Sequence, residues 1–565
     1  MMRVSRLASA GLPILAALGT LCLATPAWPA DAAQWPDYKL SADIDPATHR
    51  LSGVAEVTLP AAMAGQPVEF VLAANFSITA SNPPVEKLPG DASSKVFAGI
   101  NGTSEELANR RGVAAWRLDL PAGSSTFRIE YSGLVDIPPT ASPEEYARSF
   151  AETPGIISND GVYLAGSTLW YPQLGGAQAG ELVTYSLTVN TPKGWHLIAP
   201  GNGVSTGTDG MARWESPTAV DEISLAGGPL TPYTTNAGMV EAQVYLRQPD
   251  PALAAKYLDA TSRYLRMYNE LLGAYPYRKF ALVENFWETG YGMPSYTLLG
   301  PQIIRFPFIL TSSYPHEILH NWWGNSVYVD YATGNWCEGL TAYLADHLMK
   351  EIEGQGAEYR RDVLKKYRDF ASSSADFPLR AFRSRHSAAT EAVGYGKTLM
   401  GFHMLRQQMG DDAFRQALGF FYKTYRGQRA SFSDVQSVFE KFSGQDLGRF
   451  FDEWTNRTGA ADLQLASVKV TQQDKRYTVS GEIRQQQNEA YALEVPVVVA
   501  TAAGPVITKV RSRDPVTPFS IETTSAPQVV AVDPAFDVFR ILDPRETAPS
   551  IGQIFGASEV LAVLP

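Results

Sequence analysis

The stretch SYPHEILHNWWGNSVYVDYATGNWCEGLTAY, residues 313–343, carries two histidines four positions apart, His316 and His320, and a glutamate, Glu317, directly after the first. Residues at positions i and i+4 of an α-helix lie on one face, so both imidazoles would project in the same direction. Zn²⁺ favours imidazole nitrogen, and with three protein ligands it keeps one position open for water. The H-E-x-x-H spacing therefore predicts a helix with two metal ligands beside a carboxylate that can act as a base.

The third metal ligand has three candidates downstream of His320. Glu338 begins the helical pattern EGLTAYLADHLMKE, on a helix that could return a carboxylate to the metal. Asp330 falls in the connection between the two helical patterns, and Asp346 lies two turns deeper along the second one. No third histidine follows at the short spacing of the H-x-x-G-x-x-H zinc proteases. These positions favour Glu338.

The residue pattern changes twice along the chain and predicts a multidomain α+β protein. Residues 35–230 alternate apolar and polar side chains in runs such as YKLSADI and FRIEYSGLV, which indicates an all-β domain. Residues 235–458 show mainly helical spacing, as in PALAAKYLDATSRYLRMYNELL, and would form the catalytic domain. Alternation returns over residues 460–547, which predicts a C-terminal β-sandwich, and residues 548–565 form an apolar tail.

The first thirty residues have the order of a secretory signal peptide. Arg3 and Arg6 precede an apolar run that Pro13 interrupts, and small residues and prolines follow it. The run is close to the lower length limit for a membrane span, so an uncleaved anchor is the alternative. The interruption and the small residues favour cleavage. We therefore expect an exported protein, periplasmic or extracellular, with no membrane span in the mature chain.

Charge and cysteine content exclude several classes of function. The formal charge of −11 becomes −13 without Arg3 and Arg6, and no long basic stretch interrupts this balance. This argues against nucleic acids and anionic membranes as partners. Of two cysteines only Cys337 lies outside the predicted signal, so no internal disulfide is expected.

Taken together, these motifs resemble the zinc aminopeptidases that include alanyl aminopeptidase and leukotriene hydrolase. HEILHNWWGN and WCEGLTAY are similar to the family's H-E-x-x-H-x-W-x-G-N and W-L-N-E-G segments. VGYGKTLMGFHML resembles the Y-x-K-G segment, whose tyrosine faces the zinc, and STLWYPQLGG resembles the segment around W-F-P in the N-terminal β-domain. FFDEWTNRTG looks like the end of the catalytic domain. The resemblance spans roughly residues 35–460 and implies a thermolysin-like catalytic domain.

Carried over to this chain, the resemblance implies one Zn²⁺ bound by His316, His320 and Glu338. Glu317 would be the general base that takes a proton from the attacking water and passes it to the leaving amine. Tyr395 would donate a hydrogen bond to the developing oxyanion. Peptides would be the substrates, and such a site can also accept cobalt or manganese.

Two departures separate this chain from the family pattern. Seventeen residues, 321–337, lie between the second histidine and the glutamate, where the family usually has eighteen. A loop between helices tolerates such a deletion. The family's G-x-M-E-N glutamate binds the free α-amine of the substrate, but GMPS has Pro294 at that position and Ser295 in place of the asparagine. A prolyl residue offers neither a charge nor an N–H donor.

Recognition of the substrate amine is therefore the open point of the sequence. Gly292, Met293 and Glu288 are the predicted substrate-binding residues, and Glu284 and Glu391 are the other carboxylates that could anchor an amine. The preferred hypothesis is an exported zinc aminopeptidase with non-standard amine recognition. The alternatives are an endopeptidase that needs no free N-terminus and a non-catalytic, peptide-binding relative.

Overall fold

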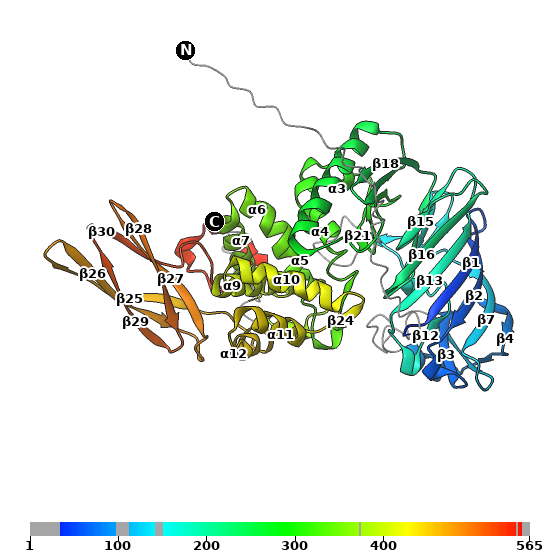
Figure 1. Cartoon of the computed structure of the whole chain (residues 1–565), viewed down its shortest axis with the longest axis horizontal. Coiled ribbons are helices and arrows are strands. Elements are labelled where there is room, and N and C mark those ends of the chain that lie inside the picture. Colours follow the sequence, from blue (N-terminus) through cyan, green and yellow to red (C-terminus); the bar gives the residue numbers. More distant parts are fainter. Residues whose placement is uncertain (1–33, 98–111, 142–150, 372–374, 550–551, 556–565) are drawn as a thin grey trace, which may run out of the picture.

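The computed structural model describes residues 34–97, 112–141, 151–371, 375–549 and 552–555. The predicted signal peptide, residues 1–30, lies outside these residues, as does most of the predicted tail, 548–565. Figure 1 shows β-rich structure at one end (blue and cyan), helices in the middle (green and yellow) and β-rich structure at the other end (orange). This arrangement confirms the multidomain α+β class.

The N-terminal β-unit is built on a seven-stranded sheet whose central strands bury one face. Buried and exposed residues alternate along all of β1 (Asp37–Asp45), because successive side chains of a strand point to opposite faces. Two four-stranded sheets contribute to the same core.

The spatial order in the large sheet is β15 (Asn202–Val204), β16 (Met211–Val220), β13 (Val183–Asn190), β1, β2 (Arg50–Thr58), β7 (Thr126–Leu134) and β4 (Ser77–Asn82). One smaller sheet has the spatial order β12 (Gln173–Leu174), β3 (Pro67–Ala73), β6 (Val113–Asp119) and β5 (Glu86–Lys87). The other has the order β10 (Gly155–Ser158), β11 (Gly161–Leu164), β17 (Leu225–Gly228) and β14 (His196–Ile198).

A five-stranded sheet joins this β-unit to the helical unit, because its central strands are buried on both faces. In β20 (Lys279–Glu284) the side chains alternate between two cores: Ala281 and Val283 belong to the N-terminal core, Phe280 and Leu282 to the helical one. A strand buried on both faces has a continuous apolar sequence, here FALV. The spatial order is β18 (Thr231–Ala237), β19 (Val240–Leu246), β20, β22 (Tyr296–Leu299) and β21 (Gly290–Met293), so β21 is an edge strand.

The helical unit begins with α3 (Pro251–Leu272), whose start follows from its sequence. The Asp250 carboxylate accepts the N–H of Leu253 at 2.9 Å, and Pro251 occupies the first turn, where an N–H has no helical partner. The later helices are α4 (Ser313–Leu319), α5 (Cys337–Ala342), α6 (Leu348–Ile352), α7 (Gly356–Phe370), α8 (Ala388–Glu391), α9 (Thr398–Met409), α10 (Asp411–Tyr425), α11 (Phe432–Ser443) and α12 (Gly448–Phe451).

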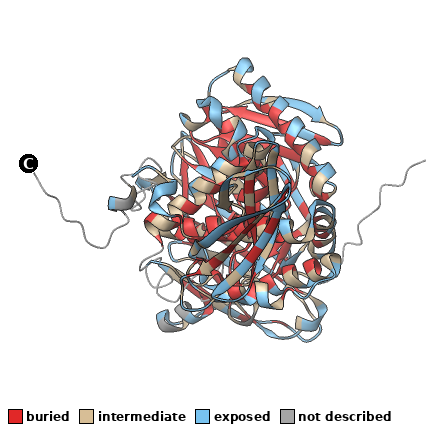
Figure 2. Ribbon diagram, turned by 90° about the vertical axis from the view of Figure 1, so that its left-hand side faces the viewer, coloured by how far each residue is buried: buried red, intermediate tan, exposed pale blue. Residues whose placement is uncertain are grey.

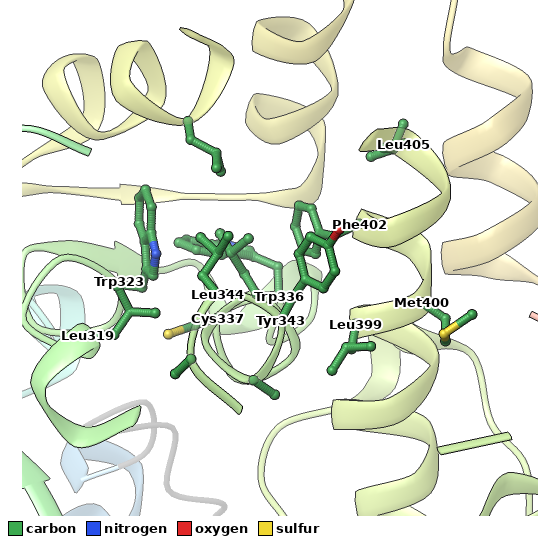
Figure 3. Packing of buried hydrophobic residues seen from close by; sticks show 14 of the residues in the cluster. Leu319, Trp323, Trp336, Cys337, Tyr343, Leu344, Leu399, Met400, Phe402 and Leu405 are labelled. Atoms are coloured by element: carbon green, nitrogen blue, oxygen red, sulfur yellow. The ribbon is translucent and has the colours of Figure 1, made fainter. Parts of the chain in front are cut away.

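The H-E-x-x-H helix α4 and the following helix α5 are short, and the core beneath them holds them in place. Figure 3 shows Leu319 at the end of α4, Trp323, Trp336 and Leu399 of α9 in this core. Both tryptophans are fully buried, and their rings meet edge to face with centroids 6.2 Å apart. Burial of such large rings supplies stability that two helices of six or seven residues lack by themselves.

The C-terminal β-unit consists of two three-stranded sheets whose buried residues continue the helical core. Val495 and Val497 of the strand β27 (Leu493–Thr501) belong to that core, and the ring of Trp454 stacks on Tyr491 at a centroid distance of 4.5 Å. Figure 2 shows buried residues gathered in the interior and exposed residues on the outer sides of the elements. The first sheet has the spatial order β25 (Leu463–Gln473), β26 (Arg476–Gln485) and β29 (Val516–Thr523). The second has the order β28 (Gly504–Ser512), β27 (Leu493–Thr501) and β30 (Pro527–Val532).

A buried polar cluster also joins the helical unit to the C-terminal β-unit. Arg360 of α7 donates to Asp537 Oδ1 at 2.8 Å and lies 2.9 Å from His347 Nε2. His403 Nε2 lies 2.9 Å from the same Asp537 oxygen. We call these four residues the Arg360 cluster. Among the described helices none is both long and apolar enough to cross a membrane.

Candidate active site

The two histidines of the H-E-x-x-H segment lie on one side of the end of α4. The N–H of His320 donates to the carbonyl of His316 at 3.1 Å, which continues the helical turn past the last residue of α4. The centroids of the two imidazole rings are 4.7 Å apart. The i,i+4 spacing therefore places both rings toward one point, as the sequence predicted.

Glu338, in the first turn of α5, brings a carboxylate to the same point. Its Oε2 lies 3.6 Å from His316 Nε2 and 3.5 Å from His320 Nε2, and the three ligand atoms lie within 4.8 Å of one another. Ligands at about 2.0–2.2 Å from a tetrahedral Zn²⁺ stand about 3.3–3.6 Å from each other. Two nitrogens and one carboxylate oxygen at these separations fit a zinc ion.

The surroundings of Glu338 keep it in the form that a metal requires. Burial raises the pKa of this carboxyl, but the charges and hydrogen bonds of His320 and His316 outweigh burial and hold the pKa well below its ordinary value. A carboxylate, and not a neutral acid, therefore faces the two imidazoles.

Each histidine is held through its other ring nitrogen. His316 Nδ1 lies 3.1 Å from Asp346 Oδ2, and His320 Nδ1 lies 3.1 Å from the carbonyl oxygen of Trp323. Such contacts fix the ring orientation and leave Nε2 to the metal. Asp346, a candidate ligand by sequence, instead orients His316. Asp330, the other candidate, accepts the N–H of Ala332 and is outside the group of ligand atoms.

The predicted base Glu317 lies against the edge strand β21. A Cβ atom at Gly292 would stand 2.3 Å from Glu317 Oε2, so this strand approaches the carboxylate as closely as a glycine allows. Both residues line one cavity of about 650 Å³, together with the three candidate ligands. The predicted base and the predicted substrate strand therefore meet at the metal triad.

Tyr395 lies in a π-helical turn, Ala392–Lys397, and faces the same cavity. Its ring is nearly parallel to that of His316, with centroids 6.4 Å apart. Burial, and then the charge of Glu338, raise the pKa of Tyr395 well above its ordinary value. The phenol therefore stays protonated and able to donate a hydrogen bond.

The predicted substrate-binding residues separate into two groups. Gly292 and Met293 line the cavity. Glu288 does not, because its carboxylate accepts the N–H of Gln302 at 2.8 Å, away from the triad. Glu284 is also absent from the lining and pairs with Arg305 at 2.6 Å. The structure therefore does not bring Glu288 or Glu284 to the site.

Glu391 does line the cavity, but it has cationic partners. Its Oε1 accepts from Lys366 Nζ at 2.6 Å, and its Oε2 lies 3.9 Å from Arg385 Nη1. These two cations neutralise the charge of Glu391, so this carboxylate is less suited to bind the substrate amine.

The turn at Pro294, which replaces the family's glutamate, is fixed to the metal helix. Ser295 adopts a left-handed backbone with φ of 67°, and its N–H donates to Asn321 Oδ1 at 2.7 Å. The buried Lys279 donates through Nζ to Ser295 Oγ at 2.7 Å. Ser295 therefore anchors the β21–β22 turn and does not face the substrate.

Residues 311–454 match a family model described as the peptidase family M1 domain. This segment belongs to peptidase family M1. It contains the three candidate ligands, Glu317 and Tyr395, so the resemblance seen in the motifs is confirmed. The turn at Pro294 lies outside the matched segment of the M1 domain.

Curated relatives of this M1 domain are named as aminopeptidases. The alanine/arginine aminopeptidase of Saccharomyces cerevisiae is 21% identical over 182 residues, which cover 31% of this chain and 21% of the relative. The glutamyl aminopeptidase of Sus scrofa is 24% identical over 168 residues, which cover 28% of this chain and 18% of the relative. The chain thus aligns with about a fifth of the length of these proteins.

The fold likeness extends beyond the M1 domain. The M1 zinc metallopeptidase of Deinococcus radiodurans superposes with a TM-score of 0.55 at 19% identity and covers 75% of this chain and 93% of its own. A mutant of that protein has been solved bound to a Tyr-Ser-Ala substrate. At this identity the likeness establishes a shared fold.

Two groups at the site were not assigned from the sequence. The sequence pattern offers Asp346 only as a ligand, whereas in the structure it orients His316 from two turns after Glu338. Asp221 and Glu222 line the cavity from the N-terminal β-unit, in the connection between β16 and β17. No periodicity or motif in the sequence links this connection to the H-E-x-x-H segment.

Proposed function

We propose that the chain is a zinc-dependent metallopeptidase that hydrolyses peptide bonds, as an aminopeptidase with non-standard recognition of the substrate amine. The proposal rests on the triad of His316, His320 and Glu338, whose ligand atoms lie within 4.8 Å of one another inside an M1 domain. Glu317 and Tyr395 line the same cavity and supply the remaining chemistry.

The roles of the residues follow from their chemistry. His316, His320 and Glu338 hold one Zn²⁺, which when bound polarises the scissile carbonyl and acidifies water. The Glu317 carboxylate takes a proton from the attacking water and delivers it to the leaving amine nitrogen. The Tyr395 hydroxyl donates a hydrogen bond to the carbonyl oxygen as negative charge develops there.

The edge strand β21 supports the binding of an extended peptide. Its described partner is β22 alone, so the backbone N–H and C=O groups of its other edge are available for a further strand. A peptide paired along Gly292 and Met293 would pass directly over Glu317, since both residues line the cavity beside this carboxylate.

Two substitutions test the roles of base and ligand separately. The Glu317→Gln variant is expected to bind zinc stoichiometrically but to lose hydrolysis of peptides, while Glu338→Ala is expected to lose zinc. Metal content by mass spectrometry and hydrolysis rates give both results. If the zinc-loaded Glu317→Gln variant hydrolyses peptides as fast as the wild type, Glu317 is not the general base. A fully zinc-loaded wild type that cleaves no member of a diverse peptide library would instead identify a non-catalytic peptide-binding protein.

One peptide with a free or an acetylated N-terminus separates aminopeptidase from endopeptidase. An aminopeptidase is expected to cleave the free peptide and not the acetylated one. Equal rates on both peptides would establish the endopeptidase alternative. Pro294 motivates this alternative, because it replaces the glutamate that binds the substrate amine in the family.

We also propose that the protein is exported. The order of Arg3, Arg6, an apolar run and small residues supports a cleaved signal. N-terminal sequencing of the protein purified from cell fractions tests this. A mature chain that begins near residue 31 is expected, and an intact N-terminus in the membrane fraction would point to an anchor.

A further inference from the structure

The cavity over the metal triad carries an excess of negative charge. Its described lining includes seven carboxylate side chains and only two cationic ones, Lys366 and Arg385. A divalent ion at the triad would not balance this difference. A cavity of this kind attracts cationic groups in a substrate.

The cationic side chains of the lining lie on one side of the cavity, beside Glu391. The lining also includes Asp221 and Glu222, which we call the acidic pair. Among the described residues no cation lies within ion-pair distance of the acidic pair. Glu222 Oε2 accepts the backbone N–H of Gly166 at 2.9 Å.

Arg429, the cation whose charge acts on Asp221, is engaged elsewhere. Its two terminal nitrogens donate to the carbonyl oxygens of Val329, at 3.1 Å, and Gly180, at 2.7 Å. Burial raises the pKa of Asp221 in spite of this guanidinium, and burial and the charge of Asp221 raise the pKa of Glu222 to about 7. A cation between the two carboxylates would relieve both effects.

The acidic pair lies beside the strands that face the substrate. Ser224, two residues after Glu222, has its Oγ 2.8 Å from the hydroxyl of Tyr296, the residue that follows the Pro294–Ser295 turn. Tyr331, which lines the cavity, has its pKa raised first by burial and then by charges that include Asp221 and Glu338. The pair is therefore near both the β21–β22 turn and the metal triad.

We infer that Asp221 and Glu222, which are not paired with the lining cations Lys366 and Arg385, form an anionic subsite that binds the cationic group of a peptide substrate. The inference rests on the proposed peptidase function. Pro294 cannot supply a negative charge to the substrate amine. The acidic pair, which belongs to the N-terminal β-unit, supplies this charge instead. The cation is an ammonium or guanidinium group, either the α-amine of the peptide or the side chain of a lysine or arginine.

Kinetics of the Asp221→Asn/Glu222→Gln double variant test the subsite. Four peptides are compared, with alanine or lysine at the N-terminus and with a free or acetylated amine. The variant is expected to raise KM at least tenfold for cationic peptides that are cleaved, or the inhibition constant for those that only compete. It is expected to change kcat less than twofold and to leave the inhibition constant of acetyl-alanine peptides unchanged. A matched control is Asp362→Asn, because Asp362 lines the cavity but its side chain is 69% exposed.

The pattern across the peptides identifies the source of the cation. A defect with every free amine assigns the subsite to the α-amine, and a defect with acetyl-lysine peptides assigns it to the side chain. An unchanged KM or inhibition constant for all cationic peptides, or an equal rise in the inhibition constant of acetyl-alanine peptides, would overturn the inference.

Peptide binding separates this inference from the failure of the proposed function. Calorimetric titration of the zinc-loaded Glu317→Gln variant with the same four peptides needs no turnover. Cationic peptides are expected to bind at least tenfold more tightly than acetyl-alanine ones, and the added double substitution is expected to abolish the difference. If the wild type cleaves nothing but this difference is found, the peptidase proposal fails and the subsite stands. If no difference is found, the subsite is rejected.

Discussion

At Gly292 the main chain of β21 comes so close to the Glu317 carboxylate that any side chain would collide with it. The Gly292→Ala variant is therefore expected to lower kcat at least tenfold, because the added Cβ at 2.3 Å from Oε2 displaces the base. Zinc content should stay unchanged, since Gly292 holds no ligand.

Gly290 offers the control for this substitution. It lies in the same strand, and a Cβ at that position meets no atom within 4 Å. The rate of peptide hydrolysis and the zinc content are measured for both variants. Equal activity of Gly290→Ala and Gly292→Ala would show that the contact with Glu317 has no catalytic consequence.

The ligand residues were predictable from sequence because the rule that places them is local. His316 and His320 are one helical turn apart, and Glu338 opens the next helical pattern. The acidic pair was not predictable, since roughly a hundred residues and a change of fold type separate Asp221 and Glu222 from the triad. Only the assembled structure brings them to the same cavity.

Among the elements, the turn that follows α5 orients one of the candidate metal ligands. It is a π-helical turn, Tyr343–His347, in which the helix takes one additional residue. Asp346 in this turn reaches His316, and His347 reaches Arg360. The sequence pattern EGLTAYLADHLMKE predicts a regular helix and carries no signal of this widening, so the role of Asp346 could not be derived from it.

His347 in this turn makes the stability of the protein depend on pH. Burial and the positive charges of His403 and Arg360 lower the pKa of His347 to about 2, from an ordinary value of 6.5. In the unfolded chain His347 gains a proton below pH 6.5, while in the folded protein it stays neutral. The free energy of unfolding is therefore expected to fall as the pH drops below 6.5, by up to about 1.4 kcal/mol per pH unit from this residue.

The His347→Gln variant isolates this contribution, because Gln keeps an acceptor for Arg360 but does not titrate. Urea unfolding at pH 7.0, 6.0 and 5.0 should show a smaller loss of stability in the variant than in the wild type. Identical pH dependence of the two proteins would mean that His347 is protonated in the folded state.

At the scale of the whole molecule, the helical unit and the C-terminal β-unit share one core and the Arg360 cluster. The side chains of Arg360 and Asp537 are only 7% and 18% exposed. Asp537→Ala is therefore expected to lower the free energy of unfolding by about 3–5 kcal/mol, because it leaves a buried guanidinium without its charge partner. Calorimetry should show both units unfolding in one transition at a lower temperature.

Glu482→Ala is the control for this substitution. Glu482 pairs with Arg484 at 2.8 Å in the same β-unit, but their side chains are 31% and 43% exposed. Its loss is expected to lower the free energy of unfolding far less than the loss of Asp537, because solvent screens an exposed ion pair. Separate transitions for the helical unit and the C-terminal β-unit, or equal effects of the two substitutions, would contradict a shared core.

The overall architecture followed from periodicity, but the junctions between units did not. Alternation in strands such as β1 and helical spacing in α3 are properties of single segments. The two-sided burial of β20 and the continuation of the helical core into β27 depend on which segments meet. These long-range pairings leave no regular pattern in the sequence.

Residues from two separately packed units line the cavity, so the two sets of residues can change independently during evolution. The proposed metal ligands, base and hydrogen-bond donor lie around α4, α5 and the turn that contains Tyr395, whereas the acidic pair lies in the connection between β16 and β17 of the N-terminal β-unit. Mutations in that connection can redirect selectivity while the bond-breaking groups are inherited intact. Chemistry and preference are thus free to evolve at different rates within one chain.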